Sequence, residues 1–211
     1  MKRQPIGFYN YTVILTYIGM LAGFLGITCA FGQKTLLAMI CLMVAGLCDM
    51  FDGAIAGTME RNDDEKCFGI QIDSLSDLIC FGVLPAVIIY SVNEMHQLAY
   101  AISALFTLAA LIRLAYFNVD EQNRQRVTDE HREIYKGLPV TSIAGLLPLV
   151  YLIQNWIGLE NYILCDILVV VVGVLFITPF QLKKPGVVGK GVMAIIGAMI
   201  FGFLIHSLGT F

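Results

Sequence analysis

Residues 48–82 read CDMFDGAIAGTMERNDDEKCFGIQIDSLSDLICFG, and the rest of the chain is organised around them. Four aspartates stand at the borders of the two long apolar segments that meet here: Asp49, Asp52, Asp73 and Asp77. The first pair is spaced i, i+3 and the second i, i+4, so each pair shares one face of a helix. A carboxylate inside a membrane helix costs about 2.5–3.5 kcal/mol on insertion scales. Hard oxygen ligands that converge from two helices suit divalent cations, Mg²⁺, Mn²⁺ or Ca²⁺.

The composition of the chain is that of a membrane protein. Among its 211 residues, 58% are hydrophobic and 14% are charged, and the mean hydropathy is +0.78. A soluble domain carries about 25% charged residues, so a soluble fold is excluded. The net charge of −3 says little about partners, and no nucleic-acid partner is expected.

Seven apolar segments are long enough to cross about 30 Å of hydrocarbon. They are residues 11–31, 35–59, 68–91, 98–119, 138–157, 162–179 and 187–207. Six or eight crossings remain compatible with the same pattern. The prediction is an all-α, polytopic membrane helical bundle that forms one domain over residues 1–211. Residues 1–10 are predicted as a short interfacial segment, and residues 120–136 as a loop or a short amphipathic helix.

The distribution of basic residues predicts the orientation. If the N-terminus is cytoplasmic and the segments alternate, the basic residues that fall inside are Lys2, Arg3, Arg61, Lys66, Arg124, Arg126, Arg132, Lys136, Lys183, Lys184 and Lys190. Only Lys34 falls outside, and Arg113 lies within the fourth span. This bias follows the positive-inside rule and puts the aspartates near the cytoplasmic face of an inner, cytoplasmic membrane.

The spacing of these residues resembles a family signature. Asp49-x2-Asp52-Gly53-x2-Ala56, followed by Gly69-x3-Asp73-x3-Asp77, is similar to the pattern D-x2-D-G-x2-A-R-x8-G-x3-D-x3-D of the CDP-alcohol phosphatidyltransferases. Three further stretches resemble its serine-using branch, the membrane phosphatidylserine synthases: FGIQIDSLSDLICFGVLPA from residue 68, RLAYFNV from residue 113 and KGLPVT from residue 136.

The resemblance implies an enzyme that transfers a phosphatidyl group from CDP-diacylglycerol to the hydroxyl of L-serine and releases CMP. It implies Mg²⁺ or Mn²⁺ as cofactor, as a pair of ions, and a homodimer in the membrane. Asp49, Asp52 and Asp73 would hold the ions, with Asp77 close enough to ligate one of them. The family assigns the general base to the position of Asp77, and Asp73 could share that role.

The same resemblance implies a site for CDP-diacylglycerol. Asp52, Gly53 and Ala56 would border the nucleotide, and Gly69 would let the third span approach. An alternative reading of Gly53-x3-Gly57 is a small-xxx-small helix-packing motif.

Two departures from the signature concern this site. Gly57 stands where the family has Arg, and Gly69 comes three residues later than the strict pattern. Arg61 would lie one turn further along the same face if the helix continues, and it would then supply the missing guanidinium. The alternative reading of Arg61 is a solvated loop charge.

The acceptor site has weaker candidates. Arg113 is a lone intramembrane arginine that could meet the serine carboxylate, or pair with an aspartate, or reach the interface. Lys136 and Lys183 could meet lipid headgroups, CDP phosphates or serine, or be plain loop charges. Thr141 and Ser142, at the inner end of the fifth span, are polar enough to line the pocket or to start a helix.

Other functions stay open at this point. The same metal site could serve glycerol phosphate or inositol phosphate, although a phosphorylated acceptor would favour several arginines around the site. A catalytically silent relative that binds CDP-lipid would account for Gly57. A cation transporter would account for intramembrane aspartates, but not for the D-x2-D-G-x2-A spacing.

Overall fold

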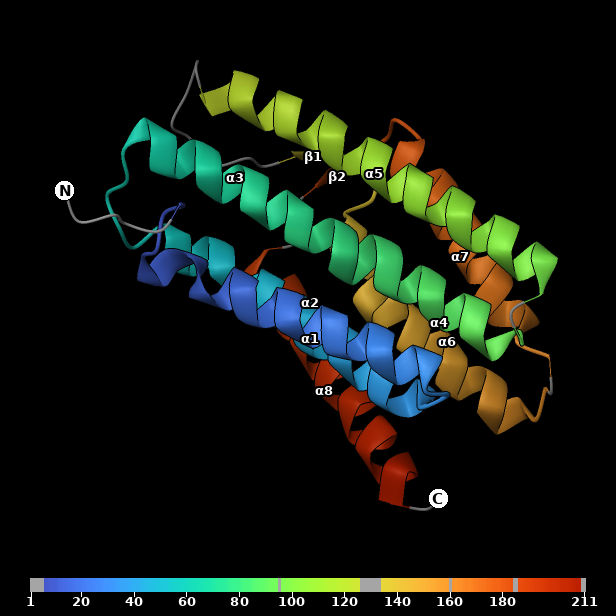
Figure 1. Ribbon diagram of the computed structural model, residues 1–211. Coiled ribbons are helices and arrows are strands. Elements are labelled where there is room, and N and C mark those ends of the chain that lie inside the picture. Colours follow the sequence, from blue (N-terminus) through green and yellow to red (C-terminus); the bar gives the residue numbers. More distant parts are fainter. Residues whose placement is uncertain (1–5, 95, 126–133, 160, 184–185, 210–211) are drawn as a thin grey trace.

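Long apolar helices make up most of the molecule (Figure 1). The computed structural model describes residues 6–94, 96–125, 134–159, 161–183 and 186–209. Its α-helices are α1 (Ile14–Phe31), α2 (Thr35–Ala56), α3 (Asp63–Asp77), α4 (Leu84–Val92), α5 (Gln97–Gln125), α6 (Ile143–Ile157), α7 (Ile163–Ile177) and α8 (Val187–Gly209). The shorter elements of the described residues are η1 (Tyr11–Val13), η2 (Leu78–Val83), η3 (Val140–Ser142), β1 (Ile134–Lys136) and β2 (Gln181–Lys183).

Six helical runs within the described residues are long and apolar enough to cross a membrane. They are Tyr11–Phe31, Thr35–Ala56, Asp63–Val92, Gln97–Arg124, Val140–Ile157 and Gly191–Gly209. The predicted span 162–179 corresponds to α7, whose 15 residues fall short of the roughly 20 that a crossing needs. The predicted all-α polytopic fold is confirmed, and the protein is an integral membrane protein. By length, the described residues support the lower end of the predicted six to eight crossings.

Some predicted boundaries were wrong. The second span ends at Ala56 rather than at residue 59. The stretch 120–136 is neither one loop nor one short helix, because α5 continues to Gln125 and β1 follows at Ile134–Lys136. Residues 126–133 lie outside the described residues. β1 pairs antiparallel with β2, so the connections before α6 and after α7 satisfy part of their backbone polar groups against each other.

The N-terminal segment turns into α1 beside the start of α3. Asn10 caps η1 by accepting a hydrogen bond from the backbone N–H of Thr12. The ring of Phe8 packs edge-on against the ring of Phe68, at 5.4 Å between centroids. The interfacial position predicted for residues 1–10 stays a prediction, and residues 1–5 lie outside the described part.

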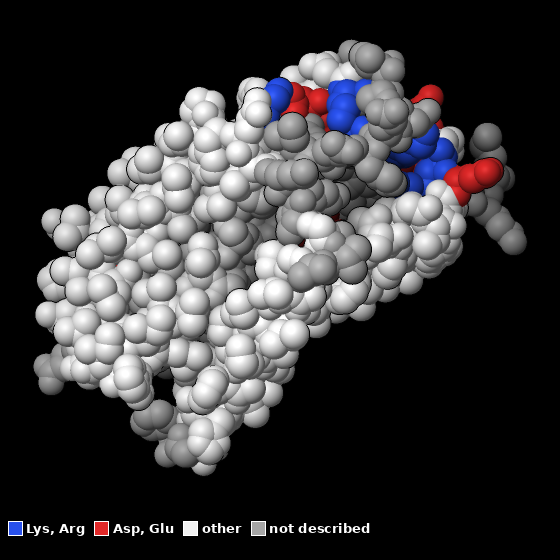
Figure 2. All heavy atoms as spheres, turned by 180° about the vertical axis from the view of Figure 1, so that it is seen from behind, with Lys and Arg blue, Asp and Glu red and all other residues white. Residues whose placement is uncertain are grey.

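On the face seen in Figure 2, most charged side chains gather at one end of the molecule, and the broad remainder is largely uncharged. Charged residues stand in the first turn of α3, with Asp63, Asp64 and Glu65, and in the last turn of α5, with Arg124. Large apolar side chains such as Phe24, Leu105 and Val174 are instead exposed on the helices. Exposed apolar surface of this extent fits a lipid environment.

Helix α1 lies against α2 and against the continuous run from α3 to α4, and glycines make this approach possible. A Cβ at Gly23 would stand 2.6 Å from Cys80 Sγ. A Cβ at Gly26 would stand 2.8 Å from Leu84 Cδ2 and 2.9 Å from Cys41 Cβ. Small residues let helix backbones approach closely in membranes, so α1 fixes the distance between the helices that carry the aspartates.

We therefore expect Gly26→Ala to lower the unfolding free energy by about 1–3 kcal/mol, because the added methyl overpacks a closed helix interface. Thermal unfolding of the purified protein in detergent measures this. The matched control is Gly197→Ala on α8, where an added Cβ meets nothing within 4 Å. Equal midpoints for the two variants would contradict the role given to Gly26.

Candidate active site

The aspartates of the quoted stretch meet where α2 and α3 run side by side. Asp49 and Asp52 lie on the last two turns of α2, and Asp73 lies on α3. One carboxylate oxygen from each of these three residues lies within 4.8 Å of the others. Oxygen ligands of one divalent cation stand about 2.0–2.6 Å from it, and hence no more than roughly 4–5 Å apart. The donor set therefore fits a hard divalent cation.

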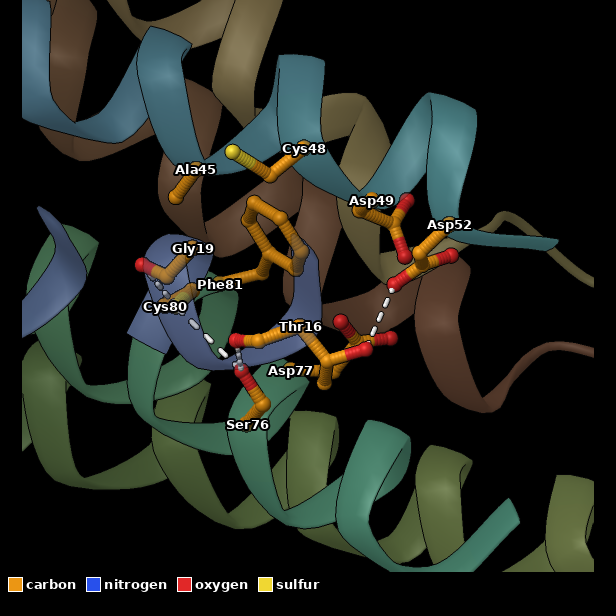
Figure 3. Close-up of a pocket in the computed structure, with 10 residues that line it drawn as sticks. All are labelled: Thr16, Gly19, Ala45, Cys48, Asp49, Asp52, Ser76, Asp77, Cys80 and Phe81. Carbon is orange, nitrogen blue, oxygen red and sulfur yellow. Dashed lines mark hydrogen bonds between the residues drawn. The ribbon is translucent and has the colours of Figure 1, made fainter. Parts of the chain in front are cut away.

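Asp77 stands beside this group rather than within it. The described three-residue cluster does not include Asp77. Its carboxylate nevertheless interacts with that of Asp49 and lines the same small pocket, together with Asp52 (Figure 3). The structure thus brings all four predicted aspartates together, three of them at ligand spacing and the fourth next to Asp49.

Hydroxyl groups from other elements support the carboxylates. Thr16 of α1 donates to Asp52 Oδ2 at 3.2 Å, and Asp52 is only 9% exposed. Thr141 of η3 interacts with the Asp49 carboxylate. Thr141 was among the candidates predicted from the sequence, and Thr16 was missed. The signal for Thr16 is a threonine in an apolar helix, which is too common to single out one residue.

The pocket beside the aspartates continues between α1 and η2. Ser76 Oγ donates to the backbone carbonyl of Thr16 at 3.4 Å, and Cys80 Sγ donates to that of Gly19 at 3.4 Å. Ala45, Cys48 and Phe81 complete this lining (Figure 3). These two bonds attach α3 and η2 to α1 next to the carboxylates.

Gly53 and Gly57, at the end of α2, face open space. A Cβ at Gly53 would meet nothing within 4 Å, and one at Gly57 would meet only carbonyl oxygens of its own helix. Neither residue lies under a neighbouring helix in the described chain, so Gly53-x3-Gly57 makes no helix contact within the described residues. Ala56 is the last residue of α2, half-buried on the same turn. This open face lies next to Asp52.

Arg61 lies against α3 rather than on an extension of α2. Helix α2 does not continue past Ala56, because Gly57 caps it and a new helix starts after Asn62 with a capping box to Glu65. The loop between them carries Arg61 to Gly69, where a Cβ would stand 3.0 Å from Arg61 Nη1. Gly69 lies one turn before Asp73 on α3. The premise of a continuing helix was wrong, but the guanidinium still lies on the aspartate-bearing helix.

The acceptor candidates lie in different surroundings. Arg113 is 6% exposed, donates from Nε to the Leu138 carbonyl at 3.2 Å and stacks over Phe117 at 5.8 Å. Lys136 donates to Asp120 at 2.8 Å, and this hydrogen bond raises the pKa of Lys136. The backbone of Lys183 belongs to β2, and its side chain lies outside the described residues.

The fold and the site together define a class of protein. It is a polytopic membrane protein with carboxylates from two adjacent helices at cation spacing, next to an open glycine face. The chain belongs to the CDP-alcohol phosphatidyltransferase family, whose model matches residues 9–178.

The chain is also similar to individual curated proteins. It is 30% identical to the archaetidylserine synthase of Methanothermobacter thermautotrophicus over 84% of this chain and 70% of that protein. It is 33% identical to the CDP-diacylglycerol–serine O-phosphatidyltransferase of Helicobacter pylori, over 69% of this chain and 56% of that one. The protein of the same name from Saccharomyces cerevisiae is 31% identical, over 56% of this chain and 43% of that protein. The matched part of the chain thus spans 43–70% of the length of these three relatives.

The cation site makes a prediction that does not depend on catalysis. We expect Asp73→Asn to weaken Mn²⁺ binding at least about tenfold, because it removes one charged oxygen ligand of the cluster. Electron paramagnetic resonance of free Mn²⁺ in titrations of the purified protein measures this.

The matched control is Asp64→Asn, the same change on an exposed residue of the first turn of α3. If both variants bind Mn²⁺ as the unmodified protein does, the aspartate cluster is not a cation site.

Proposed function

We propose that this protein transfers the phosphatidyl group of CDP-diacylglycerol to the hydroxyl of L-serine, releasing CMP and forming phosphatidylserine. The observation that carries the proposal is the meeting of the family's aspartates from α2 and α3 at cation spacing. The names of the similar proteins support serine as the acceptor.

We propose that a pair of divalent ions, Mg²⁺ or Mn²⁺, is the cofactor of this cluster. Asp49, Asp52 and Asp73 would hold them, with Asp77 as a further ligand. Bound divalent cations supply charge neutralisation of a pyrophosphate during phosphoryl transfer. The hydroxyl of Thr16 keeps one oxygen of Asp52 oriented, so that the carboxylate keeps a fixed direction within the cluster.

The remaining chemistry needs a base and a leaving group. The serine oxygen forms a bond to the phosphorus that bears diacylglycerol, and the bond from this phosphorus to the CMP oxygen breaks. Asp77 takes the proton of the serine hydroxyl, as a carboxylate within reach of the cluster can do. Asp73, one turn away on α3, is the alternative base.

We propose that the site opens to the cytoplasm, with the N-terminus on the same side. The bias of basic residues supports this orientation. CMP and serine would then exchange with the cytosol, and the diacylglycerol chains would stay among the lipids. The single domain over residues 1–211 and the homodimer implied by the family remain proposals beside this one.

Arg113 is the proposed anchor for the serine carboxylate, with Lys136 and Lys183 as weaker candidates. The burial of Arg113 within α5 supports it, because a buried guanidinium can pair with a carboxylate inside the bundle. The ion pair of Lys136 with Asp120 instead favours a structural role, in which it attaches β1 to α5.

The test of the function is CMP release by the purified full chain with CDP-diacylglycerol and Mn²⁺. We expect release with serine and none with glycerol phosphate or inositol phosphate, and Asp77→Asn provides an inactive control. If CMP is released with glycerol phosphate or inositol phosphate and not with serine, the acceptor of the proposed reaction is the phosphorylated alcohol. Absence of release with every acceptor, despite binding of CDP-diacylglycerol, would support the catalytically silent alternative.

Arg61 makes a separate prediction about the donor. We expect Arg61→Ala to raise the KM for CDP-diacylglycerol about tenfold, because it removes a charge-assisted contact to phosphate from the α3 face at Gly69. Steady-state kinetics with varied donor measure this. The matched control is Lys66→Ala, an exposed cation on the first turns of α3. If the KM of Arg61→Ala is unchanged, Arg61 is a solvated loop charge that does not contact the donor.

A further inference from the structure

The helix that carries Asp73 and Asp77 changes its winding directly after Asp77. Residues Leu78–Val83 form the π-helical turn η2, and the N–H of Leu84 bonds to the carbonyl of Ile79, five residues back. Long helices rarely adopt this winding, and single π-turns are frequent at functional sites.

A proline accounts for the π-turn. Pro85 is the second residue of α4 and has no N–H to offer. In a regular α-helix its ring would clash with the carbonyl of Phe81, four residues back. The wider turn relieves this clash. Helix α5 contacts the opened backbone, because the Thr107 hydroxyl lies 3.3 Å from the Gly82 carbonyl and shares its proton with the Ser103 carbonyl of α5 at 2.9 Å.

Side chains on both sides of the π-turn face α1. Four residues along this helix contact α1: Ser76 and Cys80 bond to its carbonyls, Leu84 packs on Gly26, and Ser91 donates to the Ala30 carbonyl at 2.6 Å. They form one continuous row from α3 to α4. This row fixes the rotation of the whole helix about its axis.

Without the π-turn, this row would drift toward the face that carries Asp77, because each step of four residues advances about 40° around a regular α-helix. In an uninterrupted α-helix, Leu84 comes seven residues after Asp77, which is close to two full turns, so the two would share one face. One extra residue in a π-turn rotates the two segments relative to each other by about 100°. Leu84 therefore joins Ser76 and Cys80 on the α1 side, while Asp77 faces Asp49 of α2 (Figure 3).

We propose that Pro85 is a positioning residue for the transfer reaction. By maintaining the π-turn, it keeps the Asp73 and Asp77 face of α3 turned toward α2 while α4 stays packed on α1. Pro85 touches no substrate and acts through the rotation of the helix. The proposal rests on the proposed function for its kinetic readout, but the geometry of the cation cluster gives it a second readout.

The variant that tests this is Pro85→Ala, in which the new N–H favours regular α-helix. We expect kcat to fall about ten- to hundredfold, with the KM for CDP-diacylglycerol little changed, because the base and ligands are misaligned. Mn²⁺ binding should weaken too, while the thermal midpoint stays equal or rises. The matched control is Pro148→Ala within α6, a helix that carries no aspartate of the cluster, and it should change neither kcat nor Mn²⁺ affinity.

The outcomes separate the two proposals. If the unmodified protein releases no CMP, the proposed function fails, and the Mn²⁺ affinity of Pro85→Ala against Pro148→Ala still decides the role of Pro85. Unmodified kcat and Mn²⁺ affinity in Pro85→Ala would overturn the positioning role.

If Pro85→Ala does not fold, Thr107→Val removes the hydroxyl that contacts the turn and should lower kcat and Mn²⁺ affinity in the same direction. Its control is Thr178→Val, whose hydroxyl also bonds to a helix carbonyl, that of Val174, outside the site. Equal values for these two variants would likewise overturn the proposal.

Discussion

Carboxylates crowded inside an apolar bundle are the constraint on which the rest of the structure depends. Two unit charges 4 Å apart repel by about 4 kcal/mol at an effective dielectric constant of 20. Asp49, Asp52 and Asp73 come within such distances of one another, and apolar helices surround them. A bound cation would remove this repulsion. Without one, the helices must resist being pushed apart, and their packing has to supply that resistance.

The packing of α1 meets this requirement. Its glycines bring it into direct contact with α2 and with the long run from α3 to α4, so the two aspartate-bearing helices are held by a common neighbour. Polar contacts follow the same interface, from Thr16 at the carboxylates to Ser91 at the far end. The hydroxyl bonds matter because few other polar partners are offered inside the membrane. The site is thus stabilised from α1, which contributes none of the aspartates.

The family signature has an arginine at the position of Gly57, whereas in this chain the arginine comes four residues later, as Arg61 in the loop after α2. A loop can thus alter the geometry of a family motif. The signature places an arginine on α2, whereas here that helix ends at Ala56 and glycine caps it. The guanidinium of Arg61 instead approaches α3 at Gly69, where a Cβ would stand 3.0 Å from Arg61 Nη1. A longer connection between the two halves of the motif is what makes this approach possible.

The sequence by itself determined the membrane-spanning, all-α fold and the grouping of the aspartates. Hydropathy acts over whole segments, and i, i+3 and i, i+4 spacing places side chains on one face whatever the neighbours are. Tertiary structure decided the rest. Thr16 joined the site only because α1 lies against α2, the paired strands depend on two connections that meet in space, and Arg61 depends on where a helix stops. The sequence also did not show which way Asp77 faces. That direction depends on the π-turn, which Pro85 produces only where α1 and α5 pack on both sides of the helix.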